Sequence, residues 1–292
     1  IQNEMTEPSK FWRPILDDGT MLAFYVHDEP RATEDPKPTP SPNVARRTRN
    51  IRAMDPYHPT YVCLIPSWKD TCAFAPIVDI VGHDPYASYL AYNSRYVAQS
   101  TRMLRAVTER RQPIWQVLQP FYFRASREHP GPSDIRHSIW SAIIHGANGI
   151  GLWGVTGGGG LSEDIRGITT QRPAFESLLR TVQDVRRLAP VILSTSSPPR
   201  VTGDNVRVAI MTRLHAGRLY AFVLNMRTGP ERVVLQWPLA NGILHDELAS
   251  QRRVPIRQGT CQLRQAPQEA LILSVDTTGP STPLSQLRRA QN

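Results

Sequence analysis

The sequence predicts an α/β domain built on a parallel sheet, followed by a small antiparallel β-sandwich. Up to residue 190, short apolar runs alternate with longer stretches of helical periodicity, as in βαβ units. From residue 191 onward, short alternating runs are separated by turn residues, which is typical of a sandwich. A chain of 292 residues is long enough for one large core with a smaller partner. We therefore predict domains at 1–190 and 191–276 and a flexible tail at 277–292.

The first predicted strand carries the candidate chemistry. Six apolar or aromatic residues at 21–26 lead into His27, Asp28, Glu29 and Pro30. Proline has no N–H for a sheet and biases the preceding residue towards an extended conformation, so Glu29 is expected at the last position of the strand. Parallel sheets hold their reactive groups at the carboxyl ends of their strands. Asp28 and Glu29 are therefore candidate site residues.

The other elements follow in order along the chain. Further strands of the parallel sheet are expected at 60–65, 77–82, 114–118 and 150–153. Helices are expected at 44–54, at 88–110, from an N-cap at Ser133 to a stop at Gly146, and at 173–188 before Ala189-Pro190. The sandwich strands are expected at 206–211, 218–224, 232–237, 243–248 and 270–275.

Several function classes are disfavoured by composition. No run of eighteen apolar residues is present, so we expect no membrane span. The net charge of +9 comes from scattered arginines, not from a basic patch with interleaved aromatics, so we expect no nucleic-acid partner. Cys63, Cys72 and Cys261 lack metal-ligand spacing and are expected to be free thiols. The glycine-rich stretch 154–160 lacks the lysine of a phosphate loop. We predict neither a metal nor a cofactor.

Five segments together resemble a known family. They are AFYVHDEP at 23–30, DPYHPT at 55–60, DIVGHDPY at 79–86, WQVLQ at 115–119 and HGANGIGLW at 145–153. This succession resembles the carboxyl-terminal part of a TIM-type (β/α)8-barrel glycoside hydrolase, a family in which a small β-sandwich is often appended. In its large retaining clan the acid/base glutamate follows strand four in an Asn-Glu-Pro-like motif. The resemblance maps Glu29 onto that residue.

Counting from this motif leaves the barrel incomplete. The predicted strands become four to eight, and the first three βα units are missing. Because five strands cannot close the ring, we expect the chain to be a fragment of a longer product, or to be completed by the missing amino-terminal half or by another chain. The alternative is an open five-stranded sheet of another kind.

The second catalytic carboxylate also departs from the family pattern. The clan places its nucleophile glutamate at the end of strand seven, where this sequence has Gln116 and Gln119. Asp84 is one replacement, as base or nucleophile. Asp28 is another, orienting a 2-acetamido group as in families resembling the hexosaminidases. The third alternative is that no bond is cleaved. The sequence thus predicts a glycoside hydrolase acting on an oligo- or polysaccharide, or else a catalytically inactive carbohydrate-binding protein.

Like-charge repulsion and partial burial are expected to raise the pKa of Glu29 and make it a proton donor. Its simpler reading is a rim carboxylate paired with an arginine, and Asp84 before Pro85 is also a common turn-former. Further side chains are expected to bind the sugar, the two tryptophans by stacking on its ring and the others by hydrogen bonds to its hydroxyls. These are His27, His83, Tyr86, Gln119, Trp153 and Trp68. The localisation is left open, with a secreted or periplasmic location slightly favoured over a cytoplasmic one.

Overall fold

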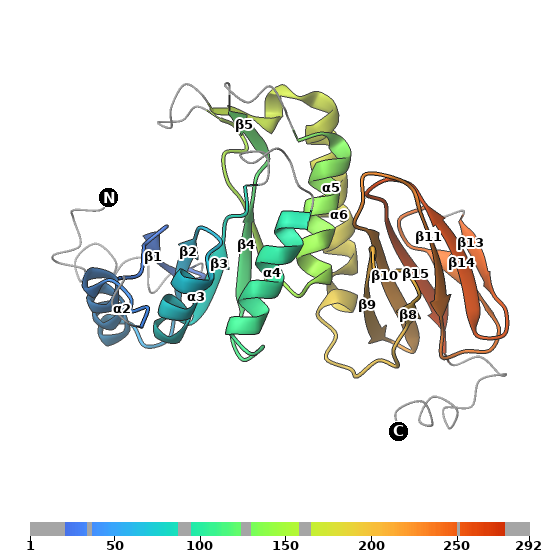
Figure 1. Cartoon of the computed structure of the whole chain (residues 1–292), viewed down its shortest axis with the longest axis horizontal. Helices are drawn as coiled ribbons and strands as arrows, with labels where there is room; N and C mark the ends of the chain where they lie inside the picture. The colour runs from blue at the N-terminus through green and yellow to red at the C-terminus, as the bar shows by residue number, and fades with distance from the viewer. Residues whose placement is uncertain are drawn as a thin grey trace. The chain divides into compact units, whose positions relative to one another are not determined.

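The computed structural model describes residues 21–33, 37–86, 95–123, 130–157, 165–249 and 252–277. They form a mixed α/β structure with one five-stranded parallel sheet and several antiparallel sheets (Figure 1). The chain divides into two compact units, one of residues 1–86, 96–118 and 146–153 and one of residues 87–95, 119–145 and 154–292. The boundary at 190 remains a prediction. The tail from 278 and the start of the helix predicted from 88 lie outside the described residues.

The first unit contains the parallel sheet. Its strands are hydrogen-bonded in chain order, with β1 and β6 at the two edges. The prediction of 114–118 is confirmed without change, while the other strands differ from prediction at their ends. The five strands are β1 (Phe24–Asp28), β2 (Thr60–Leu64), β3 (Ile80–His83), β4 (Ile114–Leu118) and β6 (Gly149–Leu152).

Three helices pack on one face of this sheet (Figure 1): α2 (Pro42–Met54), α3 (Trp68–Phe74) and α4 (Arg95–Val107). The core between them is apolar, with Val26, Val62 and Val81 of the strands fully buried against the helices. Helix α3 was not predicted, because seven residues are too few to show a period. Ser67 caps it by accepting a hydrogen bond from the N–H of Asp70 at 3.3 Å, and a 3-10 turn at Ala75–Ile77 follows.

The opposite face of the sheet carries an aromatic ladder formed by Tyr25, Tyr61 and Trp115. The rings of Tyr25 and Tyr61 stack with centroids 5.3 Å apart, and those of Tyr61 and Trp115 lie 4.7 Å apart at 42°. Glycines on neighbouring strands make room for the rings. A Cβ at Gly82 would lie 2.7 Å from the Tyr61 ring, and one at Gly149 would lie 2.5 Å from the Trp115 ring. The ladder therefore requires both glycines.

The second unit contains two longer helices, α5 (Pro132–Ile144) and α6 (Arg172–Ile192). The predicted N-cap at Ser133 is wrong, because Pro132 occupies the first turn and Gly131 is the cap. Its N–H donates to the Asp134 carboxylate at 2.9 Å. The predicted end of α6 before Pro190 is also wrong, since the helix continues to Ile192. Proline there disturbs only the last turn. Three short elements were not predicted: β5 (Phe121–Phe123) before α5, and β7 (Ile165–Gly167) and the 3-10 turn Ile168–Thr170 between the two helices.

Two antiparallel sheets with a common apolar core complete this unit (Figure 1). Helix α5 packs on the larger sheet, where the rings of Trp140 and Phe222 lie 6.1 Å apart. The larger sheet has the order β13-β12-β15-β10-β9, from β9 (Val208–His215), β10 (Arg218–Asn225), β12 (Gly242–Asp246), β13 (Arg253–Ile256) and β15 (Ala270–Asp276). The smaller has the order β14-β11-β8, from β8 (Thr202–Gly203), β11 (Glu231–Gln236) and β14 (Thr260–Gln265).

Two whole-chain expectations concern membranes and cysteines. Within the described ranges, no helix is long and apolar enough to cross a membrane. The three cysteines are free thiols, as predicted, with Cys63 and Cys261 buried and Cys72 half-buried.

Candidate functional site

The candidate site lies at the carboxyl edge of β1, β2 and β3. The N–H of Glu29 donates to the carbonyl oxygen of Cys63 at 2.9 Å, and the N–H of Asp84 donates to that of Leu64 at 3.2 Å. These two carbonyls are consecutive at the end of β2, so residues from two non-adjacent strands are brought to one place. The carboxyl group of Glu29 contributes there to the raised pKa of Asp84.

Asp84 is the buried member of this pair. Only 5% of the residue is exposed, and its Oδ1 atom has no hydrogen-bond partner among the described residues. Burial, reinforced by the carboxyl group of Glu29, raises the pKa of Asp84 to about 9. Asp84 therefore holds a proton at neutral pH.

Glu29 is the exposed member, and its backbone is unusual. Strand β1 ends at Asp28, so Glu29 follows the strand instead of closing it as predicted. Its φ of +44° lies in the left-handed region, which costs a residue other than glycine about 1–3 kcal/mol. The loop that follows is fixed to α3, because the Asp70 carboxylate accepts from the Ala32 N–H at 2.8 Å and from Arg31 Nη1 at 3.0 Å. Asp70 thus restrains the chain just beyond Glu29.

Asp28 completes a group of three carboxyls, here called the carboxyl cluster: Asp28, Glu29 and Asp84. The hydroxyl of Tyr25 donates a hydrogen bond to the Asp28 carboxylate. Burial and this hydrogen bond raise the pKa of Tyr25, so the hydroxyl keeps its proton. The charges of all three carboxyls also help to raise the pKa of Tyr86, which is elevated chiefly by burial. In the described part of the chain, no set of three His, Cys, Asp or Glu residues is arranged to hold a metal ion.

Two of the residues predicted to bind the sugar lie together. The rings of Tyr86 and Trp153 stack with centroids 5.9 Å apart and an interplanar angle of 21°. They follow β3 and β6, and each residue is half-buried. This pair combines an apolar face with polar tips, the combination that aromatic binding surfaces use.

The remaining predicted site residues are placed differently. His27 is half-buried, and its Nδ1 donates to the Asp28 carbonyl oxygen at 2.7 Å. His83 is fully buried between Thr71 Oγ1 at 2.8 Å and Ser100 Oγ at 2.9 Å, and burial lowers its pKa to about 3. It faces α3 and α4 as a neutral ring. Trp68, the first residue of α3, is 56% exposed.

The two glutamines expected at the end of strand seven also differ from each other, since Gln116 lies within β4 and Gln119 follows it. Gln116 lies fully buried beside Ser100, with which it exchanges hydrogen bonds at 3.2 and 3.3 Å. Gln119 belongs to the second unit and donates to the carbonyl oxygen of Phe121 at 3.0 Å. Sequence reasoning overlooked Tyr25 and Asp70. The spacing Ser67-x-x-Asp70 is a helix-capping signal that would have located Asp70.

Comparisons with known proteins give a fold likeness only. No protein family matches the sequence, and no curated protein matches it. A family 5 glycoside hydrolase from Bacteroides vulgatus is similar in structure with a TM-score of 0.58, at 11% identity, over 97% of this chain and 69% of that chain. The likeness is one of fold, which this chain shares with known glycoside hydrolases.

Two α-amylases extend the likeness. A maltogenic α-amylase from Thermotoga neapolitana has a TM-score of 0.54 at 15% identity over 91% of this chain. An α-amylase from Anoxybacillus has a TM-score of 0.53 at 13% identity over 80% of it. The chain spans 63% and 56% of the lengths of these two enzymes, which is less than two thirds.

Proposed function

We propose that this chain is a glycoside hydrolase acting on an oligo- or polysaccharide, with its parallel sheet corresponding to strands four to eight of a (β/α)8 barrel. The observation that carries the proposal is the placement of Glu29 and the buried Asp84 on consecutive carbonyls at the carboxyl edge of that sheet, where burial and Glu29 raise the pKa of Asp84. A carboxyl group that keeps its proton at neutral pH supplies the acid that glycosidic cleavage needs. The glycoside hydrolase fold supports the same reading.

Glu29 is assigned as the proton donor and Asp84 as the group that shares its proton. The two catalytic carboxyls of glycosidases flank the scissile bond, about 5–9.5 Å apart. Asp84 is only 5% exposed, whereas Glu29 is exposed, so the flanking role is not assigned to Asp84. The exposed Glu29 passes the proton to the glycosidic oxygen as the C–O bond breaks. Water then supplies hydroxide to the sugar and returns a proton to the pair.

Asp28 is assigned as the second carboxylate. The Tyr25 hydroxyl holds it in place next to Glu29. In one route it activates the attacking water or attacks the sugar itself, and in the other it orients a 2-acetamido group of the substrate that acts as the internal nucleophile. Tyr86 and Trp153 stack on a sugar ring, and His27 and Trp68 stay as proposed contacts. His83 is left out of the proposed site because both ring nitrogens are used inside the core.

A catalytically inactive carbohydrate-binding protein is the second candidate. Gln116 and Gln119 favour it, because an amide cannot replace the nucleophilic glutamate expected after strand seven. This candidate retains the aromatic pair and predicts sugar binding without turnover.

The test compares Glu29→Gln with a matched control, Glu109→Gln. Glu109 is also exposed, lies in the same unit and has a φ of +48°, but it pairs with Arg111 away from the carboxyl cluster. Loss of the general acid is expected to lower kcat about 10²- to 10⁴-fold for aryl glycosides with poor leaving groups, and much less for activated ones. The control is expected to retain wild-type rates.

Three outcomes decide between the readings. An equal loss with good and poor leaving groups would mean that Glu29 is not the proton donor. If calorimetry detects sugar binding but none of the glycosides tested is hydrolysed, the chain is the catalytically inactive carbohydrate-binding protein. Cleavage of 2-acetamido substrates alone, abolished in Asp28→Asn, would assign Asp28 the orienting role.

A further inference from the structure

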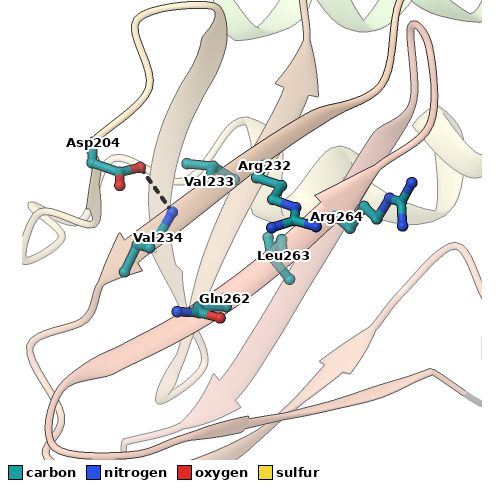
Figure 2. Close-up of a pocket in the computed structure, with 7 residues that line it drawn as sticks. All are labelled: Asp204, Arg232, Val233, Val234, Gln262, Leu263 and Arg264. Carbon is teal, nitrogen blue, oxygen red and sulfur yellow. Dashed lines mark hydrogen bonds between the residues drawn. The ribbon is translucent and has the colours of Figure 1, made fainter.

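A groove on the outer face of the smaller antiparallel sheet has a volume of about 510 Å³. This is within the range of small-molecule sites. It lies in the second unit and shares no residue with the carboxyl cluster. Figure 2 shows the seven residues that line it, which are Asp204, Arg232, Val233, Val234, Gln262, Leu263 and Arg264.

Strand register places two arginines side by side in this groove. Arg232 of β11 is directly opposite Arg264 of β14, and both are exposed. Like charges in directly opposed positions destabilise a sheet. No acidic side chain in the described part of the chain lies within ion-pair distance of either guanidinium. The pair therefore offers ten N–H donors without an anion to neutralise it.

A fixed carboxylate stands at the other end of the groove. Asp204 Oδ1 accepts from the N–H of Val234 at 2.8 Å, and the Asp204 N–H donates to the carbonyl oxygen of Val234 at 3.3 Å. Figure 2 shows Asp204 and Arg264 at opposite ends of the lining set. Gln262 of β14 lies directly opposite Val234 of β11 in the strand register. The groove thus offers cations at one end and acceptors for hydroxyl groups at the other.

We propose that this groove binds an acidic saccharide whose carboxylate contacts Arg232 and Arg264. Guanidinium groups bind carboxylates through paired charge-assisted hydrogen bonds. The second oxygen of the Asp204 carboxylate and the Gln262 amide accept hydrogen bonds from sugar hydroxyls. A single-stranded nucleic acid fits less well, because none of the seven lining residues offers an aromatic ring for stacking. The proposal is independent of hydrolysis at Glu29.

The test is calorimetric titration of the full chain with an oligogalacturonate, a neutral malto-oligosaccharide and inorganic phosphate. The double variant Arg232→Gln/Arg264→Gln is compared with Arg200→Gln/Arg253→Gln, which removes two exposed charges elsewhere in the same unit. The first is expected to bind oligogalacturonate at least about tenfold more weakly, as for the loss of charge-assisted bonds, and the second to bind it normally. If both double variants bind oligogalacturonate equally weakly, the effect is one of net charge and the proposal is overturned.

Two further results would also overturn it. Binding of the neutral sugar as tight as that of the acidic one would remove the role of the arginines. Displacement by inorganic phosphate at the same concentration would make the groove a plain anion site. A thermal readout separates binding from structure, because Arg264→Gln should raise the Tm of the free protein and lose the extra stabilisation by oligogalacturonate. A lower Tm in the free variant would indicate that the pair is structural.

Discussion

Asp84→Asn tests the shared proton through stability. In the folded protein the raised pKa keeps Asp84 protonated at neutral pH, whereas in the unfolded chain it ionises near pH 4. The native state therefore binds more protons than the unfolded state between about pH 4 and about pH 9. By linkage, this group makes the free energy of unfolding fall as pH rises through that window. Asparagine has the same shape and does not titrate.

The size of the effect follows from the pKa difference. At pH 7, about three pH units above the unfolded pKa, the proton held by Asp84 corresponds to about 4 kcal/mol. Water reaching the pair through the exposed Glu29 lowers this to about 2–4 kcal/mol. Relative to wild type, Asp84→Asn is thus expected to gain about 2–4 kcal/mol of stability between pH 4 and pH 7.

Urea unfolding of both proteins across this range measures the difference. Other groups, His83 among them, titrate in the same range. Their contributions cancel when the free energy of unfolding of wild type is subtracted from that of the variant. Parallel stability profiles for wild type and variant would refute the reasoning, since they would mean that Asp84 is ionised in the folded protein.

Three other substitutions test neighbouring parts of the first unit. Gly149→Ala places a methyl group against the Trp115 ring and is expected to lower the free energy of unfolding by about 1–3 kcal/mol, whereas Gly229→Ala, with open space around its Cβ position, serves as the control for urea unfolding. Asp70→Ala removes the acceptor of the Ala32 N–H and is expected to lower kcat about tenfold by loosening the loop after Glu29. Asp70→Asn keeps an acceptor and should restore most of the rate. Unchanged kinetics in Asp70→Ala would exclude a positioning role. His83 binds fewer protons in the folded than in the unfolded protein, so its contribution to stability is lost as pH falls below about 6.5. His83→Asn should therefore weaken the fall of the free energy of unfolding with decreasing pH, as measured by urea titration. An unchanged pH dependence would assign the effect to other groups.

The parallel sheet was predictable to the extent that local patterns determine it. The run Ile114–Leu118 is a short apolar segment after a proline, and β4 begins and ends there. Helix α3 was missed because seven residues carry too little periodicity. Asp28 and Glu29 were identified from their place before a proline at a strand end, a purely local signal.

The relation between Glu29 and Asp84 could not be read from the sequence. It depends on both backbone N–H groups meeting consecutive carbonyls at the end of β2. The direction of His83 was equally hidden, because alternation along a strand separates two faces without saying which one the helices cover. Thr71 and Ser100, which hold that ring, come from helices on either side of β3 in the chain.

At position 29 the residue that best suits the left-handed backbone differs from the residue that the proposed chemistry needs. A φ of +44° suits glycine, so Glu29→Gly should relieve strain while removing the carboxyl group. A library selected for thermal resistance would enrich glycine at this position, and one selected for turnover would retain glutamate. Comparing the two enrichments would report on the role of residue 29 without any knowledge of the natural sugar.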